Sequence, residues 1–100
     1  MQSFINKLRD TDGSVAKLDS ISKKDMNRLL GDLRGELDAI VDYNETIEAT
    51  QNEDIRRVLT DIRNEEQAHV GQLMNLILRD QNFRNNYNMG IEQNRDILGE

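Results

Sequence analysis

Residues 62–73, Ile-Arg-Asn-Glu-Glu-Gln-Ala-His-Val-Gly-Gln-Leu, decide the fold. Within them Ile62, Glu66, His69 and Leu73 follow one another at steps of four, three and four residues. Such steps place side chains on one face of an α-helix. Apolar residues at the same steps extend this face in both directions, so the stretch predicts a helix over about residues 53–80. The packed face of that helix would carry a glutamate and a histidine.

Glu66 and His69 form a Glu-x-x-His pair, which is half of the metal-ligating set of di-iron carboxylate proteins built on helical bundles. A complete site needs two such pairs and one glutamate from each of two further helices. This chain has a single histidine and therefore a single pair. A carboxylate in an apolar face is costly unless it is paired, hydrogen-bonded or bound to metal. The sequence therefore predicts half of a metal site, which becomes whole in a dimer.

A second apolar face precedes this one and predicts a first helix over about residues 23–50. Ser22-Lys-Lys-Asp25 fits a capping box at its start. Asn52, followed by two acidic residues, is a good N-cap for the second helix. A turn this short makes the two helices antiparallel. The face advances at steps of four and three residues, with Asn44 as its only polar step: Met26, Leu30, Leu33, Leu37, Ile40, Asn44, Ile47.

Glu36 is the carboxylate that the first helix offers to the pair. With the turn at residue 51, Glu36 lies 15 residues before it and Glu66 lies 15 residues after it. At a rise of 1.5 Å per residue, both lie about 22 Å from the turn. A two-fold partner would double the set to four glutamates and two histidines. We therefore expect an all-α fold, an antiparallel two-helix hairpin that dimerises into a four-helix bundle.

Composition narrows the class of protein. The chain has 100 residues, no cysteine, no proline, a net charge of -6 and 36% hydrophobic residues. No apolar run approaches the roughly 20 residues of a membrane span, and no basic stripe is wide enough for nucleic acid. We expect an intracellular, cytoplasmic protein with an N-terminal leader at 1–22, the hairpin at 23–80 and a C-terminal tail at 81–100. In the tail we expect turns around the Asn-rich residues 81–88, a stop at Gly90 and a short helix at 91–98.

Two segments resemble the encapsulated ferritin family of small, two-helix, ferritin-like ferroxidases. They are Gly35-Glu-Leu-Asp-Ala-Ile40, with Tyr43 seven residues after Glu36, and Arg63-Asn-Glu-Glu-Gln-Ala-His69. The resemblance covers about residues 25–80. It implies that two hairpins pack as a ferritin-like dimer around one di-iron centre. Glu36, Glu66 and His69 of each subunit would bind iron, and Tyr43 would lie beside the centre.

The resemblance also implies an assembly and a destination for the iron. Members of the family form a ring of dimers, typically a decamer, oxidise Fe(II) and pass the iron to an encapsulin shell. The expected location is then the cytoplasm, inside an encapsulin nanocompartment. The family often places acidic residues beside the ligand glutamate, where iron enters the protein. Asp38 and Asp42 are the candidates here, whereas Gly35 stands where one such carboxylate is expected.

Two other functions remain open on the residues alone. In the first, the chain is a non-catalytic helical oligomerisation module in which Glu66 and His69 are a polar register device. In the second, it is a metal-binding buffer or sensor without turnover, and the same ligands suit zinc or manganese as well as iron. Gly31, Gly35 and Gly71 each cost a helix about 1 kcal/mol relative to alanine. They indicate either a close approach of helices near the metal or simple tolerance.

Overall fold

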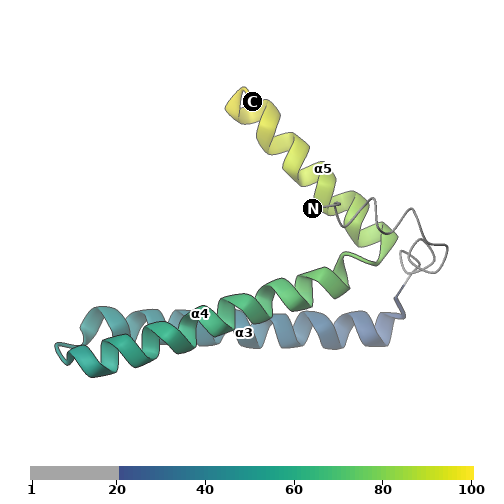
Figure 1. Cartoon of the computed structure of the whole chain (residues 1–100). Coiled ribbons are helices and arrows are strands. Elements are labelled where there is room, and N and C mark those ends of the chain that lie inside the picture. Colours follow the sequence, from purple (N-terminus) through teal and green to yellow (C-terminus); the bar gives the residue numbers. More distant parts are fainter. Residues whose placement is uncertain (1–20) are drawn as a thin grey trace, which may run out of the picture. The chain divides into compact units, whose positions relative to one another are not determined.

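The computed structural model describes residues 21–100, which form three helices and no strand. Helix α3 spans Lys23–Ala49, α4 spans Glu53–Ile77 and α5 spans Gln81–Leu98 (Figure 1). The prediction of an all-α fold is confirmed. The leader predicted at 1–22 lies outside the described residues except for its last two. None of the described helices is both long enough and apolar enough to cross a membrane.

The described residues belong to two compact units. One unit is the hairpin of residues 23–75, and the other holds residues 76–100 together with Ile21 and Ser22. The predicted division at residues 22 and 80 differs slightly from this partition and stays a prediction. The candidate metal ligands all lie in the hairpin unit.

The hairpin unit consists of α3 and α4, which lie side by side and run antiparallel (Figure 1). Both helices begin at the predicted residues, α3 directly after Ser22 and α4 directly after Asn52. Helix α3 ends one residue before the predicted end, and α4 ends three residues before it. The early end of α4 has a local cause, because Asp80 is used to start the next helix.

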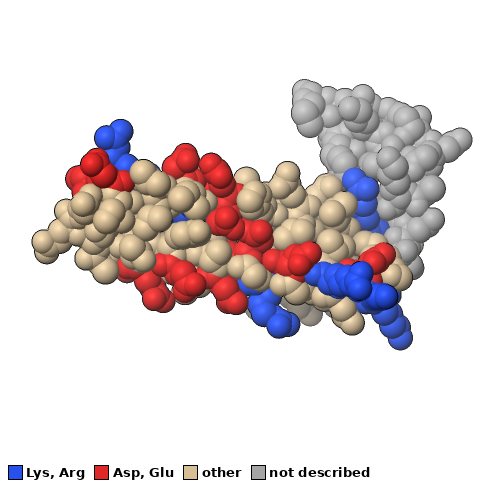
Figure 2. Space-filling model, turned by 90° about the horizontal axis from the view of Figure 1, so that it is seen from below, with Lys and Arg blue, Asp and Glu red and all other residues tan. Residues whose placement is uncertain are grey.

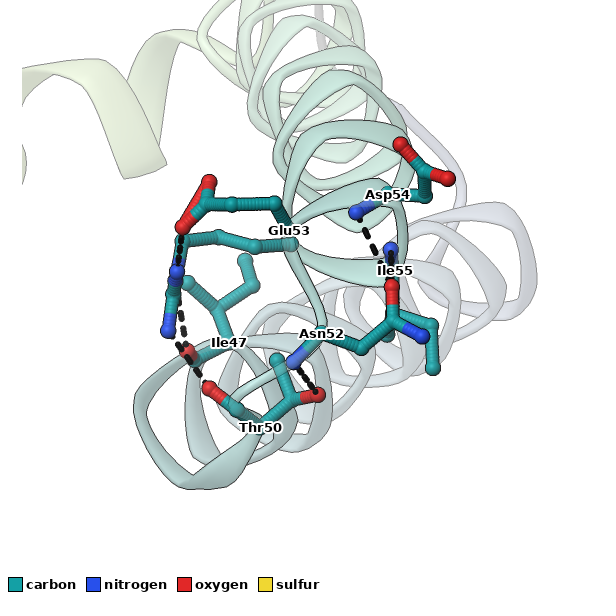
Figure 3. A network of polar contacts seen from close by, with 7 residues as sticks. Ile47, Thr50, Asn52, Glu53, Asp54 and Ile55 are labelled. Atoms are coloured by element: carbon teal, nitrogen blue, oxygen red, sulfur yellow. Dashed lines mark hydrogen bonds and ion pairs between the residues drawn. The ribbon is translucent and has the colours of Figure 1, made fainter.

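The turn between α3 and α4 is held by side chains that hydrogen-bond to the backbone (Figure 3). Asn52 Oδ1 accepts from the backbone N–H groups of Asp54 at 3.0 Å and Ile55 at 3.1 Å. The hydroxyl of Thr50 accepts from the N–H of Asn52 at 3.1 Å. Asn52 thus satisfies donors that the first turn of any helix leaves without an intrahelical partner. The predicted N-cap is confirmed.

Arg56 closes the same turn from the α4 side. Its guanidinium donates to the carbonyl oxygens of Ile47, at 3.4 Å from Nε, and of Thr50. It also forms an ion pair with Glu53. Carbonyls at the end of a helix have no intrahelical donors and carry partial negative charge, so a cation stabilises them. One arginine therefore links the end of α3 to the start of α4.

The hairpin has a thin core. Among its described residues 23–75, none is fully buried. Large apolar side chains remain open to solvent, including Leu37 at 48% and Val41 at 53% exposure. Outside the hairpin unit, Ile77 is fully buried. A chain of this size buries too little apolar surface to be very stable alone and often depends on assembly or metal.

The region after α4 differs from the sequence prediction. The turns expected at residues 81–88 and the stop at Gly90 are wrong, because α5 is continuous from Gln81 to Leu98. Asparagine and glycine are weak helix formers, but propensity is only a weak prior. A good N-cap works in favour of the helix, since Asp80 Oδ2 accepts from the N–H of Phe83 at 2.9 Å. The helix ends at Gly99, whose φ of 72° suits glycine.

Asp80 also accepts a hydrogen bond from a distant part of its unit. Its Oδ1 lies 2.9 Å from the backbone nitrogen of Ile21. These backbone donors, Ile21 first and then Phe83, lower the pKa of the Asp80 carboxyl below its ordinary value. Only 9% of this residue is exposed. The ionised Asp80 therefore ties the backbone at Ile21 to the first turn of α5.

Candidate metal centre

The structure brings Glu36, Glu66 and His69 together at mid-length of the hairpin. One ligand atom from each lies within 4.8 Å of the others. His69 Nδ1 is 3.4 Å from Glu36 Oε2 and 3.8 Å from Glu66 Oε2. Among the described residues, this is the cluster of acidic and histidine side chains that could hold a metal ion.

Two helices position these side chains. Glu36 comes from α3, and Glu66 and His69 come from adjacent turns of α4. The three-residue connection from Thr50 to Asn52 makes positions at equal distances from the turn lie at one level. The prediction that Glu36 lies level with Glu66 is confirmed, because ligand atoms of Glu36 on α3 and of Glu66 and His69 on α4 lie within 4.8 Å of one another. That these residues bind metal stays a prediction.

The cluster is open to solvent on one side. The side chains of Glu66, Glu36 and His69 are 20%, 24% and 46% exposed. A groove of about 490 Å³ runs beside them and is lined by Gly31, Asp32, Gly35, Glu36, His69, Gln72 and Leu73. A single hairpin therefore leaves room at the ligand atoms for a metal ion and for groups from another molecule.

The glycines around the groove do not mark a close approach of helices within the described chain. A Cβ atom built at Gly31, Gly35 or Gly71 would meet nothing within 4 Å. Of the two interpretations that the sequence left open, a close approach of α3 and α4 within one chain is therefore not what these glycines serve. Gly31 and Gly35 instead leave one wall of the groove without side chains.

Electrostatics in the cluster favour a cation. The pKa of Glu66 is raised above its ordinary value, chiefly by a hydrogen bond with the carboxyl group of Glu36. Burial and repulsion from the charge of Glu36 raise it further, whereas His69 lowers it. Two carboxylates this close cannot both ionise without a penalty unless a cation lies between them. A metal ion between them would offset this repulsion and favour the ionised carboxylate of Glu66.

Three other candidate residues lie outside this cluster. Tyr43 is half-buried on α3, seven residues after Glu36. Asp38 and Asp42 are exposed on α3. Asp42 lines a separate groove with Glu45, Thr46, Ala49 and Thr50. The structure therefore does not gather the aspartates, proposed as the place where iron enters, with the ligand cluster.

Acidic side chains spread over the hairpin face shown in Figure 2, where they outnumber basic ones. This agrees with the net charge of -6. A surface of one charge sign raises the local concentration of oppositely charged ions at low salt. The same surface also serves solubility, so the charge alone does not specify a metal.

The sequence reasoning missed a second polar contact between the two helices. Arg63 on α4 donates through Nη1 to Asn44 Oδ1 on α3 at 3.0 Å. Asn44 was recognisable as the only polar step in the face of the first helix. The spacing of apolar residues did not identify Arg63 as the partner of Asn44, because the guanidinium group of an arginine lies far from its own Cα.

Comparison with known proteins relates the chain to one family. A family described as EncFtn-like matches residues 12–90. A ferritin-like-encapsulin shell fusion protein of Pyrococcus furiosus is 44% identical over 43 residues, which are 43% of this chain. That match spans only 12% of the length of the fusion protein. No solved structure gives a significant match.

Proposed function

The chain belongs to the EncFtn-like family, and on that premise we propose that it is a ferroxidase. It oxidises Fe(II) to Fe(III) at a di-iron centre shared between two copies of the chain. One observation carries this proposal. Two carboxylate oxygens and one imidazole nitrogen lie within 4.8 Å of one another beside an open groove.

The donor set fits iron. Carboxylates are hard ligands that accept both Fe(II) and Fe(III), and imidazole suits iron as well. The raised pKa of Glu66 fits a cation in the same place, because two adjacent carboxyl groups lack a positive partner among the described residues other than His69. Manganese and zinc accept similar ligands, so the oxidation of Fe(II) is what distinguishes the proposed activity.

Each residue has a defined task in this proposal. Glu36 and Glu66 would bind Fe(II) through their carboxylates. His69 binds through Nδ1, the nitrogen that faces both glutamates, so its other ring nitrogen carries the proton. Bound iron supplies the redox chemistry, with Fe(II) as the electron donor and dioxygen as the acceptor. Tyr43, on the same side of α3 as Glu36, lies beside the centre in the dimer.

A second copy of the chain completes the site. One hairpin supplies two glutamates and one histidine, and a di-iron carboxylate site uses four glutamates and two histidines. A two-fold axis through the open groove supplies the other half. We further propose that these dimers form a ring and that the ring works with an encapsulin-type shell in the cytoplasm. The name of the Pyrococcus furiosus relative, which joins ferritin-like and encapsulin shell parts, supports that association.

The test is aerobic oxidation of added Fe(II) by the purified protein, followed by absorbance of Fe(III). We expect oxidation faster than in buffer alone and its loss in Glu66→Ala and His69→Ala. Glu65→Ala is the matched control, because Glu65 is the exposed neighbour outside the cluster and its loss should change nothing. Equal oxidation by the His69→Ala variant and the unmodified protein would refute the assignment.

Two other outcomes would identify the alternative functions. Tight metal binding without faster oxidation would indicate a metal buffer. An oligomer that forms without metal, with no metal bound and no faster oxidation, would indicate an interaction module. Size-exclusion chromatography with and without metal separates these two outcomes.

A further inference from the structure

Arg63 makes an unusual set of contacts for an arginine on a thin hairpin. Besides the bond from Nη1 to Asn44, its Nη2 donates to Asn64 Oδ1 at 3.2 Å. Its Nε is buried and has no hydrogen-bond partner among the described residues. An unsatisfied buried donor reduces stability. Arg63 therefore combines a hydrogen bond across the hairpin with a buried donor that lacks a partner in the described chain.

The contact between Arg63 and Asn44 lies on the side of the hairpin away from the metal groove. A residue advances by about 100° around a helix, so Asn44 and Gly35 lie roughly 80° and 100° from Glu36 in opposite senses. On α4, Arg63 and His69 lie roughly 60° from Glu66 in opposite senses. Gly35 and His69 line the groove. One flank of the hairpin is thus joined by a hydrogen bond, and the other is left open at the ligands.

The hydrogen bond between Arg63 and Asn44 can fix the rotation and separation of α3 and α4, which the turn alone cannot. The short turn already fixes which residues of α3 and α4 stand at one level. It leaves the helices able to rotate and separate farther along, because apolar contacts between leucine and isoleucine side chains are not directional. A polar contact within an apolar seam specifies one arrangement of the helices. Here that contact lies between the turn and the metal ligands.

We propose that Arg63 is a positioning residue for the metal centre. Through Asn44 it fixes the rotation and spacing of α3 and α4, so that Glu36 faces Glu66 and His69 before metal arrives. The proposal rests on the proposed metal site, but it concerns the geometry of the metal-free hairpin. A preorganised site binds metal more tightly, because less order has to be gained on binding.

The first test measures binding of Co(II) by titration calorimetry, without iron or turnover. Arg63→Met keeps an unbranched apolar stem and removes the donating guanidinium, and Asn44→Leu removes the acceptor. We expect each to weaken Co(II) binding about tenfold, the low end for residues that orient metal ligands. Because the two act as one contact, the double variant should bind no more weakly than either single variant. Arg63→Lys should recover part of the affinity.

Arg57→Met is the matched control, since Arg57 is an exposed arginine on the same helix. It should leave Co(II) binding unchanged. Far-ultraviolet circular dichroism must show the same helix content in every variant, so that unfolding is not mistaken for lost positioning. If Arg63→Met binds Co(II) as the unmodified protein does, while Glu66→Ala does not, the positioning role is refuted and the metal site stands.

A second measurement decides the proposal even if the unmodified protein fails to bind metal. The chain has no cysteine, so cysteines introduced at exposed Glu45 and Asp61 can carry a single pair of spin labels. Labelled chains are diluted with unlabelled ones, so that pulsed electron resonance reports distances within one hairpin. We expect Arg63→Met to broaden the distance distribution and Arg57→Met to leave it narrow. An unchanged distribution in Arg63→Met would overturn the proposal independently of the metal.

Discussion

The turn of the hairpin and the cluster at its mid-length differ in how their polar groups find hydrogen-bond partners. At the turn, Asn52 and Thr50 accept from backbone N–H groups, and Arg56 donates to the carbonyls that end α3. At mid-length, Glu66 faces the carboxyl group of Glu36, which raises the pKa of Glu66, and both glutamates lie near a half-exposed histidine. The turn needs nothing from outside, whereas the cluster has an excess of acceptors and one open side. Where the chain satisfies its own polar groups it builds structure, and where it does not it can bind a ligand.

The pKa values of two carboxyl groups, Asp80 and Glu66, show the same contrast. Asp80 accepts from two backbone donors, and its pKa is lowered. Glu66 faces another carboxyl group, and its pKa is raised. The difference lies in the neighbours, since both side chains carry the same acid group. A carboxylate with donors contributes to the fold, and a carboxylate beside its like is available for a cation.

The largest expected effect comes from filling the open cluster. Metal that binds only the folded protein raises the free energy of unfolding, by about 2.7 kcal/mol at a free concentration 100 times Kd. We therefore expect Co(II) to raise the Tm of the unmodified protein and of Glu65→Ala. His69→Ala should show no such rise in a thermal melt followed by circular dichroism. A comparable rise in His69→Ala would mean that metal binds elsewhere.

Breaking the turn should reduce stability without touching the cluster. Asn52→Ala removes the acceptor for two backbone N–H groups, and loss of such a cap costs about 1 kcal/mol. Urea unfolding of the metal-free protein measures this loss. Asn52→Ser, which keeps a capping oxygen, is the control and should retain most of the stability. A loss of Co(II) affinity in Asn52→Ala at full helix content would contradict the independence of the two regions.

The groove should tolerate an added methyl group at Gly35. Gly35→Ala is expected to raise the free energy of unfolding of the metal-free protein by up to about 1 kcal/mol, because alanine favours a helix. A Cβ at Gly35 meets nothing within 4 Å. Gly71→Ala, at another open position, should behave alike in the same urea titration. Lower stability in Gly35→Ala alone would show that the groove is covered in the metal-free protein.

The smallest effect concerns Asp80 and appears only in acid. A lowered pKa in the folded state means that the ionised carboxyl contributes stability above its ordinary pKa. That contribution is lost as pH falls through the lowered pKa. Asp80→Asn should therefore be less stable than the unmodified protein at pH 7, and the difference should shrink as the pH is lowered. Unfolding curves of both proteins from neutral to acid pH measure it, and a difference independent of pH would refute the ionic role.

Much of the hairpin could be predicted from local features. Apolar residues that recur every three or four positions indicate a helix through its geometry alone. Asn52 caps α4 by accepting from backbone N–H groups two and three residues away. The level of Glu36 with Glu66 follows from the rise per residue and a short turn. The extent of α5 could not be predicted in this way, because weak helix formers at 81–90 were outweighed by the cap at Asp80 and a good C-terminal stop at Gly99.

The sequence by itself thus determined the two antiparallel helices, their starting residues and the three side chains that meet between them. Only the tertiary structure decided which flank of the hairpin is open and that Arg63 joins Asn44 on the other flank. It also decided that the glycines border a groove and that Glu66 holds its proton more tightly than usual. The physical reason is distance in the chain. Periodicity and caps act over a few residues, whereas rotation of packed helices and the pKa of facing carboxyl groups depend on residues that are 19 to 33 positions apart.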